Sequence, residues 1–348
     1  MKQSIAELQA YRVLMRMLRP VVTTRDEAAQ LTDAQRDWLV RRAIQERGAS
    51  WMLTHAAQGL VHLTSGQRAA LQEAANVEMR RVLEADALRQ SLRALFTGPS
   101  SALLLLKGAS IEERAYPPGI MRPSIDVDAL VAPNALPEVH TFLARNGLAC
   151  VYRAPTGRTE QWVGAGGGAS LDLHLRLGCP VRFPAYGTSQ VVDAAVARAT
   201  RLSDGTRVLH PIDATLHLLV HLAAGLGGDL RHVADTRQWL GQHGDALASV
   251  SAMAAHVGVL RAVCAAAAWL VDASDPSAPL EALVARMPAA DRHLARLQRV
   301  VVQRYYLRHG PPLPPSLCAL TELLTVDFPR GAVGLAGLTG NAALSRYR

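Results

Sequence analysis

Three aspartates have the spacing of a metal site. Asp126 and Asp128 stand two residues apart in IDVDALV, and Asp172 follows in SLDLHLRL. Successive side chains of a strand point to opposite faces, so Asp126 and Asp128 are expected on one face while Val127 packs on the other. Apolar residues bracket Asp172 in the same way on a later strand. Carboxylates held side by side repel each other unless a cation lies between them, so this spacing predicts a bound metal ion.

Magnesium suits such a site because it is a hard ion that prefers carboxylate oxygens and substrate phosphates. Two ions roughly 3.5 to 4 Å apart would stabilise both the attacking and the leaving oxygen of an in-line displacement at phosphorus. We therefore predict Asp126, Asp128 and Asp172 as metal ligands and catalytic residues. Mg²⁺, with two ions, is the expected cofactor, and phosphoryl or nucleotidyl transfer is the expected reaction class.

A turn suited to phosphate precedes these acids. Gly108 follows the apolar run ALLLLK, and the next segment, ASIEERAY, has helix-forming residues. The first backbone N–H groups of a helix, together with its positive dipole end, form an anion site. Lys107 can add a charge at the phosphates and Ser110 a hydroxyl in the first helical turn. For Lys107 the alternative is a strand-end residue whose stem packs on apolar neighbours.

Further polar residues allow more than one interpretation. Arg122, four residues before Asp126, can contact phosphate, or it can pair with these acids and position the loop. His217 and His221 have metal-compatible spacing on a helix, but their leucine- and alanine-rich face favours a packed pair. Arg231 and Asp235, also four residues apart, are expected to form an ion pair.

The surrounding sequence must supply the strands that position these side chains. ALLLLK, IDVDALV, LACVYR, TEQWVG and ASLDLHLRL predict strands, whereas ASIEERAY and PEVHTFLARN predict helices. The glycine stretch 164–168 is expected to form a mobile hairpin. Elsewhere apolar residues recur at helical spacing, beginning with the first residues of the chain. We expect an α+β fold, predominantly helical overall: an N-terminal helical region (1–98) with four or five helices, a small mixed-sheet α/β core (99–184) and a C-terminal helical region (185–348).

Bulk properties exclude several classes of protein. The 348 residues are 49% hydrophobic and 19% charged, which excludes a disordered chain. No uncharged apolar run reaches the roughly 18 to 20 residues of a membrane span, so we expect no membrane partner. The first residues lack the apolar stretch of a secretory signal, so a cytoplasmic protein is expected. Four dispersed cysteines (Cys150, Cys179, Cys264 and Cys318) are expected to be reduced thiols.

The net charge of +8 allows an anionic partner, such as a nucleotide, a phosphorylated substrate or RNA. The basic residues are nevertheless scattered, and few aromatic residues lie among them. This pattern favours a solvated arginine-rich surface over a nucleic-acid groove. Lysine occurs only at Lys2 and Lys107, which draws attention to the lysine beside the predicted phosphate turn.

The order of these motifs resembles the DNA polymerase beta-like nucleotidyltransferase superfamily. More narrowly, LLLLKGAS, MRPSIDVDALV, LDLHLRL and LHLLVHLAAGLGGDLRHVADTRQWL resemble a family of largely uncharacterised bacterial nucleotidyltransferases. The resemblance implies that Gly108 is the phosphate-turn glycine and that Asp172 also helps to activate the attacking hydroxyl as a general base. It also keeps His174, on the same strand face as Asp172, among the nucleotide-binding candidates. One departure is Ala109, where many superfamily members have serine.

The implied reaction moves a nucleoside monophosphate, with AMP from ATP as the expected case, onto an acceptor hydroxyl and releases pyrophosphate. The acceptor is left open among a small molecule, a peptide and a protein. Two alternatives remain. One is a catalytically weak nucleotide-sensing or partner-binding module on the same fold, and the other is an RNA- or tRNA-modifying nucleotidyltransferase.

Overall fold

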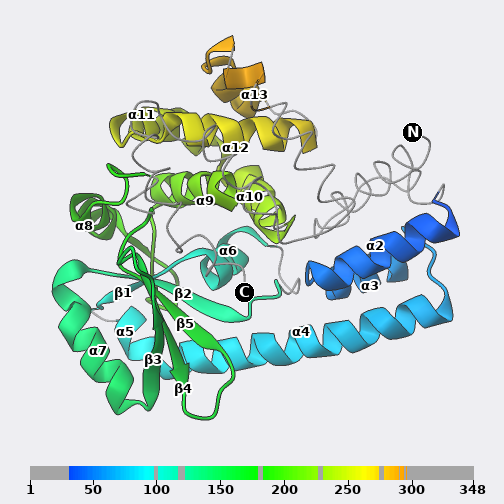
Figure 1. Cartoon of the computed structure of the whole chain (residues 1–348), viewed down its shortest axis with the longest axis horizontal. Coiled ribbons are helices and arrows are strands. Elements are labelled where there is room, and N and C mark those ends of the chain that lie inside the picture. The colour runs from blue at the N-terminus through cyan, green and yellow to red at the C-terminus, as the bar shows by residue number, and fades with distance from the viewer. Residues whose placement is uncertain are drawn as a thin grey trace.

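The computed structural model describes residues 31–97, 101–116, 122–178, 183–225, 230–273, 278–289, 291–293 and 295. Within these ranges one mixed sheet is flanked by helices from both ends of the chain (Figure 1). The predicted α+β fold with helical flanks is thus confirmed. The helix expected over the first residues, Cys179 and Cys318 lie outside the described residues, while Cys150 and Cys264 are free thiols.

The sheet has the order β3-β4-β5-β2-β1-β7-β6, and its members are β1 (Leu103–Leu105), β2 (Asp126–Val131), β3 (Leu148–Arg153), β4 (Thr159–Gly164), β5 (Ser170–His174), β6 (Thr200–Arg201) and β7 (Arg207–Val208). β2 is parallel to β5 and antiparallel to β1, and β1 is parallel to β7. β4 pairs antiparallel with both β3 and β5, which confirms a hairpin at the glycine stretch 164–168.

The first five strands confirm the sequence-based predictions, but β6 and β7 lie in a region where only helices were expected. Both lie within 185–348, and β7 joins the core sheet beside β1. Each is two residues long, which is too short for an alternation of apolar and polar residues to appear. The part of the chain expected to be purely helical therefore also completes the edge of the sheet.

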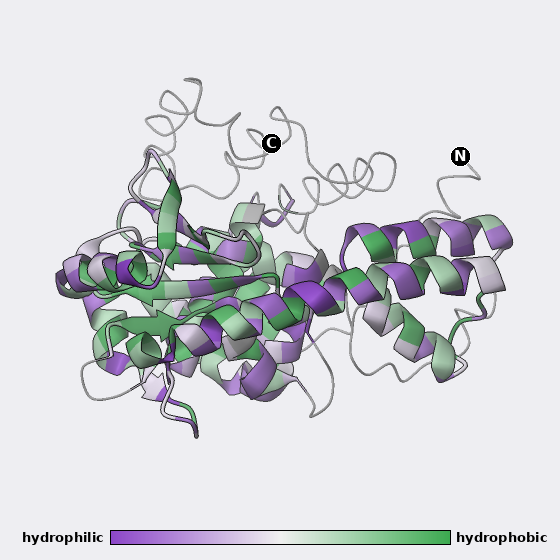
Figure 2. Cartoon of the chain, turned by 90° about the horizontal axis from the view of Figure 1, so that it is seen from below, coloured by the Kyte–Doolittle hydropathy of each residue, from purple (hydrophilic) through white to green (hydrophobic). Residues whose placement is uncertain are grey.

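The N-terminal helices are α2 (Asp33–Gln45), α3 (Ala49–Ala57), α4 (Ser65–Ser91) and α5 (Arg93–Phe96). Thr32 and Thr64 begin α2 and α4 with capping boxes, each exchanging two hydrogen bonds with the glutamine three residues later. α4 spans from α2 and α3 to the sheet, where it packs against β2 and β5 (Figure 1). Figure 2 shows hydrophilic residues along this long helix and mainly hydrophobic residues in the strands.

The remaining helices follow or interrupt the sheet: α6 (Lys107–Ala115), η2 (Pro133–Ala135), α7 (Leu136–Arg145), α8 (Ser189–Arg198), α9 (Pro211–Gly225), α10 (Leu230–His243), η3 (Gly244–Ala246), α11 (Leu247–His256), α12 (Leu260–Ala273) and α13 (Ala278–Ala285). α9 packs against α10, α11 and α12, and α10 packs against α6. None of the helices in the described ranges combines the length and apolar character that a membrane crossing demands.

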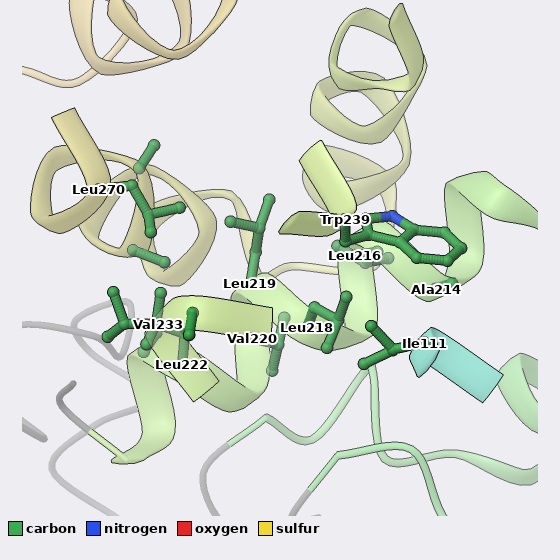
Figure 3. Packing of buried hydrophobic residues seen from close by; sticks show 14 of the residues in the cluster. Ile111, Ala214, Leu216, Leu218, Leu219, Val220, Leu222, Val233, Trp239 and Leu270 are labelled. Atoms are coloured by element: carbon green, nitrogen blue, oxygen red, sulfur yellow. The ribbon is translucent and has the colours of Figure 1, made fainter. Parts of the chain in front are cut away.

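Alternate residues of the strands are buried in two different cores. Leu104 and Leu130 join the larger core with the helices α6, α9 and α10. Figure 3 shows part of this core, with Ile111 of α6 beside Leu218 of α9. Leu105 and its neighbours on the opposite face join a smaller core with α5 and α7. Because both faces are covered, the position of β2 is fixed from both sides.

The packing of the smaller core can be tested by a substitution that leaves the three carboxylates unchanged. Leu143 of α7 is fully buried there, so we expect Leu143→Ala to lower the free energy of unfolding by about 2 to 5 kcal/mol through the cavity it creates. Urea denaturation followed by circular dichroism measures this. Thr141→Ala, at an exposed position of the same helix, should change the value by less than about 0.5 kcal/mol, and equal effects at both positions would contradict the assigned packing.

Candidate active site

The three predicted carboxylates lie on one face of the two central parallel strands. In the register of β2 and β5, Asp128 pairs with Asp172, and Asp126 pairs with Ser170. Side chains at paired positions of parallel neighbours point to the same face, and Asp126 and Asp128 share that face by alternation. Leu130, next in the same alternation, is buried in the larger core. The carboxylates therefore lie on the side of the sheet that α6, α9 and α10 cover.

Asp128 is the most strongly bound of the three acids. Its Oδ1 accepts hydrogen bonds from Lys107 Nζ at 3.1 Å and from His174 Nε2 at 2.8 Å. Burial favours the neutral form of Asp128, but Lys107 and His174 outweigh it and hold the pKa of this carboxyl well below its usual range. Burial, reinforced by the charge of Lys107, lowers the pKa of His174 to about 4. His174 is therefore a neutral donor to an ionised carboxylate at pH 7.

The pKa values of Asp126 and Asp172 are shifted in the opposite direction, upwards. Burial and the charge of Asp128 raise the pKa of Asp126. Burial, followed by the charges of Asp128 and Asp126, raises the pKa of Asp172 to about 6. Gln161 of β4, which faces Asp172 across the antiparallel pair, donates from Nε2 to Asp172 Oδ1 at 3.3 Å. The acids thus repel one another, as expected for side chains placed to share a cation.

The phosphate turn lies directly beside Asp128. Leu106 N donates to the backbone carbonyl of Asp128 at 2.9 Å, which ties the end of β1 to β2. Lys107 adopts a positive φ of 34°, and Gly108 departs from helical geometry before α6 continues. A Cβ at position 108 would lie 3.1 Å from Ser124 Oγ and 3.3 Å from Arg122 Nη1. A larger residue here would have to push these two polar side chains aside by a few tenths of an ångström, so glycine suits this position best.

Arg122 is buried beneath this turn. It forms a two-pronged ion pair with Asp235 of α10, with Nε to Oδ1 at 2.8 Å and Nη2 to Oδ2 at 2.6 Å. Arg122 Nη1 also donates to Ser124 Oγ. Burial alone would lower the pKa of Arg122, but Asp235 raises it further than burial lowers it. With its donors engaged in this way, Arg122 has the geometry of the loop-positioning alternative, but the acid that it pairs with is Asp235 and not Asp126 or Asp128.

The same network connects α6 to α10. Tyr116 Oη donates to Asp235 Oδ1 at 2.7 Å, and Glu112 Oε1 accepts from Arg122 N at 3.0 Å. The spacing alone predicts Arg231 as the partner of Asp235, whereas the structure places Arg122 against this carboxylate. Arg231 Nη1 reaches the carbonyl oxygen of Pro123 at 3.5 Å. Helix α10 thus contacts the loop before β2 through both side chains.

Ser110 and the histidines lie farther into the helical layer. Ser110 is buried and lines a small cavity with His217 and Trp239, where α6 meets α9 and α10. The rings of His217 and His221 are 6.1 Å apart and nearly parallel, which confirms the expected packed pair. His217 also lies edge-on to His174, with ring centroids 6.4 Å apart. Burial, reinforced by the charge of Lys107, lowers the pKa of both His217 and His221, so both are neutral.

The side chains of this face can be compared with the ligands that a magnesium ion needs. In the described part of the chain, no group of three or more His, Cys, Asp or Glu side chains has metal-holding geometry. The donors on the β2–β5 face are nevertheless carboxylate oxygens, which Mg²⁺ prefers. Burial, together with the charges of the neighbouring acids, raises the pKa values of Asp126 and Asp172, and a cation between the carboxylates would relieve this repulsion. The chemistry of these residues therefore fits a divalent ion.

Comparison with known proteins gives the class of this chain. It belongs to a nucleotidyltransferase family: a family model described as "uncharacterised nucleotidyltransferase" matches residues 32–272. This confirms the family resemblance of the motifs and identifies the chain as a nucleotidyltransferase. No curated protein matches the chain significantly. Among solved structures, the solution structure of the antibiotic-resistance factor ANT(2'')-Ia has 11% sequence identity and a TM-score of 0.35, covering 52% of this chain and 93% of that chain.

Three contributors to the site were not predicted from the sequence as site residues. Gln161 contacts Asp172, Ser124 packs on the glycine turn, and Asp235 holds Arg122. Gln161 could have been found from the strand alternation of TEQWVG once β4 was paired with β5. No local pattern indicates the other two, because each depends on contacts made only in the folded chain.

The buried ion pair makes a prediction about stability. Asp235→Ala would leave the Arg122 guanidinium buried without its carboxylate, and we expect it to lower the free energy of unfolding by about 3 to 5 kcal/mol. Tyr116→Phe, which removes only one hydrogen bond to Asp235, should cost about 1 to 2 kcal/mol. Chemical denaturation of both variants measures the difference. Equal stabilities of Asp235→Ala and the wild type would contradict the proposed importance of the pair.

Proposed function

We propose that this nucleotidyltransferase moves a nucleoside monophosphate, AMP from ATP as the first candidate, onto a hydroxyl of an acceptor and releases pyrophosphate. The observation that carries the proposal is the placement of Asp126, Asp128 and Asp172 on one face of β2 and β5, with Asp128 directly opposite Asp172. The reaction is proposed to occur in the cytoplasm, in keeping with the free thiols of Cys150 and Cys264. The acceptor is a small molecule, a peptide or a protein.

Asp126, Asp128 and Asp172 would hold two Mg²⁺ ions. Bound there, the ions would supply Lewis-acid stabilisation of the charge that develops on the phosphoryl oxygens. The chain itself contributes a rigid carboxylate frame, since β2 is covered on both faces and bonded to strands on both sides. Such a frame avoids reorganisation during the reaction.

Asp172 is proposed to act as the general base. The acceptor oxygen attacks the α-phosphorus and forms the new O–P bond, while the bond from that phosphorus to the β-phosphate oxygen breaks and pyrophosphate leaves. The hydroxyl proton passes to a carboxylate oxygen of Asp172. Asp172 lies opposite Asp128 in the register of β2 and β5, so its carboxylate is on the face where the acceptor oxygen would have to lie.

The triphosphate is proposed to bind at the turn formed by Lys107 and Gly108. Gly108 lets the backbone approach closely, and Lys107 and the neighbouring His174 supply donors beside Asp128. We assign Arg122 to holding this turn in place, since Asp235 and Ser124 engage its guanidinium. Ser110 stays a predicted phosphate contact, although it lies in the packing of α6 against α9 and α10.

One observation favours a second candidate, a nucleotide-sensing module with weak catalysis. Lys107 and His174 both bind Asp128, one of the carboxylates that would hold a metal ion. If this arrangement persists with nucleotide bound, the chain would bind nucleotide without turning it over. Measuring nucleotide affinity and pyrophosphate release on the same sample separates the two functions.

The proposed function predicts how aspartate variants behave. Asp126→Asn, Asp128→Asn and Asp172→Asn should each reduce pyrophosphate release by about 100-fold or more, because a metal-held transition state is worth several kcal/mol. The assay supplies each labelled nucleoside triphosphate with Mg²⁺ and candidate acceptors. Asp193→Asn, on the exposed face of α8, is the matched control and should keep wild-type rates. Wild-type activity in Asp126→Asn would sink the proposal.

A further inference from the structure

Lys107 occupies the position where a cation is needed most. Its ammonium lies 3.1 Å from Asp128 Oδ1, and both side chains are largely buried, with exposed fractions of 10% and 12%. Asp128 is the acid at the centre of the group, because Asp126 flanks it on the same strand and Asp172 lies opposite it on the next. A positive charge at this point therefore acts on all three carboxylates.

The electrostatics of the site agree with this placement. Lys107 lowers the pKa of Asp126, Asp128 and Asp172, opposing the burial and mutual repulsion that raise it. One ammonium neutralises only one of three potential negative charges. The pKa of Asp172 consequently remains raised, to about 6, even with Lys107 in place.

The backbone explains why Lys107 reaches this carboxylate. Leu105 is paired with Ala129 in the last position of β1, and Leu106 N is bonded to the carbonyl of Asp128 itself. Lys107 then takes a φ of 34°, in the left-handed region that side chains rarely adopt. This backbone conformation accompanies the contact of Lys107 with Asp128 of β2. Its contact with Asp128 is a single hydrogen bond from a flexible stem, which can be exchanged without moving the strands.

We infer that Lys107 is a displaceable counter-cation: it holds Asp128 while no metal is bound, and a divalent ion entering at Asp128 releases its ammonium towards the nucleotide phosphates. The inference rests on the proposed function and deepens it, because it makes one side chain responsible both for preserving the empty site and for binding substrate. His174 keeps its own bond to Asp128 Oδ1 and is neutral, so it does not provide the same charge.

If a metal ion displaces Lys107 from Asp128, removing the lysine should strengthen metal binding and weaken nucleotide binding. A metal ion must compete with Lys107 for Asp128, so its apparent affinity is reduced by the fraction of molecules in which the pair is closed. Lys107→Met, which keeps the length of the stem, should bind Mn²⁺ without nucleotide roughly tenfold more tightly than the wild type. The same variant should bind a non-hydrolysable ATP analogue with Mg²⁺ roughly tenfold more weakly. A lysine with a purely structural role would weaken both when removed.

Three variants control the Mn²⁺ titration, which calorimetry or electron paramagnetic resonance can follow. Arg145→Met removes one positive charge from the exposed end of α7, which packs on the opposite face of the sheet, and should leave both affinities unchanged. Lys107→Arg keeps the charge and should keep the competition with Mn²⁺. Asp128→Asn shows whether the measured ion binds at the carboxylates, because binding there should be lost.

The composition of the chain allows the exchange to be observed directly. Lys2 and Lys107 are its only lysines, so isotope labelling of lysine side chains gives two ammonium environments. Comparison with Lys107→Arg assigns the signal of Lys107. Addition of Mg²⁺ without nucleotide should shift this signal towards that of a solvated lysine, and addition of the ATP analogue should shift it again. The signal of Lys2 is the internal control.

The outcomes separate the inference from the function on which it rests. Tighter Mn²⁺ binding by Lys107→Met, together with a metal-induced shift of the Lys107 signal, supports the exchange. If Mn²⁺ binding is lost in Asp128→Asn but Lys107→Met binds no more tightly and the signal does not move, the inference is overturned while the proposed function stands. If neither Asp126→Asn nor Asp128→Asn affects metal binding, both are overturned.

Discussion

This structure depends on one constraint: the sheet holds three carboxylates close together, and their negative charges repel one another. Strand alternation places Asp126 and Asp128 on one face, and the parallel register places Asp172 opposite Asp128. Apolar residues buried in two cores fix β2 from both sides, so the acids cannot relax apart. A cation must therefore neutralise the negative charge of these acids. In the chain alone, Lys107 neutralises part of this charge. In the proposed reaction, the remaining negative charge binds the metal ions.

The helical layer forms part of the site rather than an attachment to it. Asp235 of α10 binds Arg122, which lies against the glycine turn together with Ser124, and Gln238 of the same helix donates to the carbonyl of Ala115 at 2.7 Å. Residues more than a hundred positions downstream therefore hold the loop that leads into β2. A family model that spans residues 32–272, well beyond the sheet, is consistent with this dependence.

Local sequence patterns predicted the parts of the fold that depend on local geometry. Alternation identified β2 and β5, and glycine at the end of an apolar run identified the turn at Gly108. The shared face of the acids followed from the same alternation. β6 and β7 were missed because two residues carry no periodicity. The pairing of Arg122 with Asp235 was missed because a pair so distant in sequence has no local signal, and the nearer Arg231 offered a simpler partner.

In the proposed reaction, Asp126, Asp128 and Asp172 hold the metal ions that bind the nucleotide triphosphate. The most direct measurement is a crystal structure with Mn²⁺ and a non-hydrolysable ATP analogue, in which anomalous scattering locates the metal. We expect anomalous density between the carboxylates of Asp126 and Asp128, within coordinating distance of Asp172, with the phosphates at the Gly108 turn. Nucleotide bound at another surface, or no metal density at these carboxylates, would contradict it.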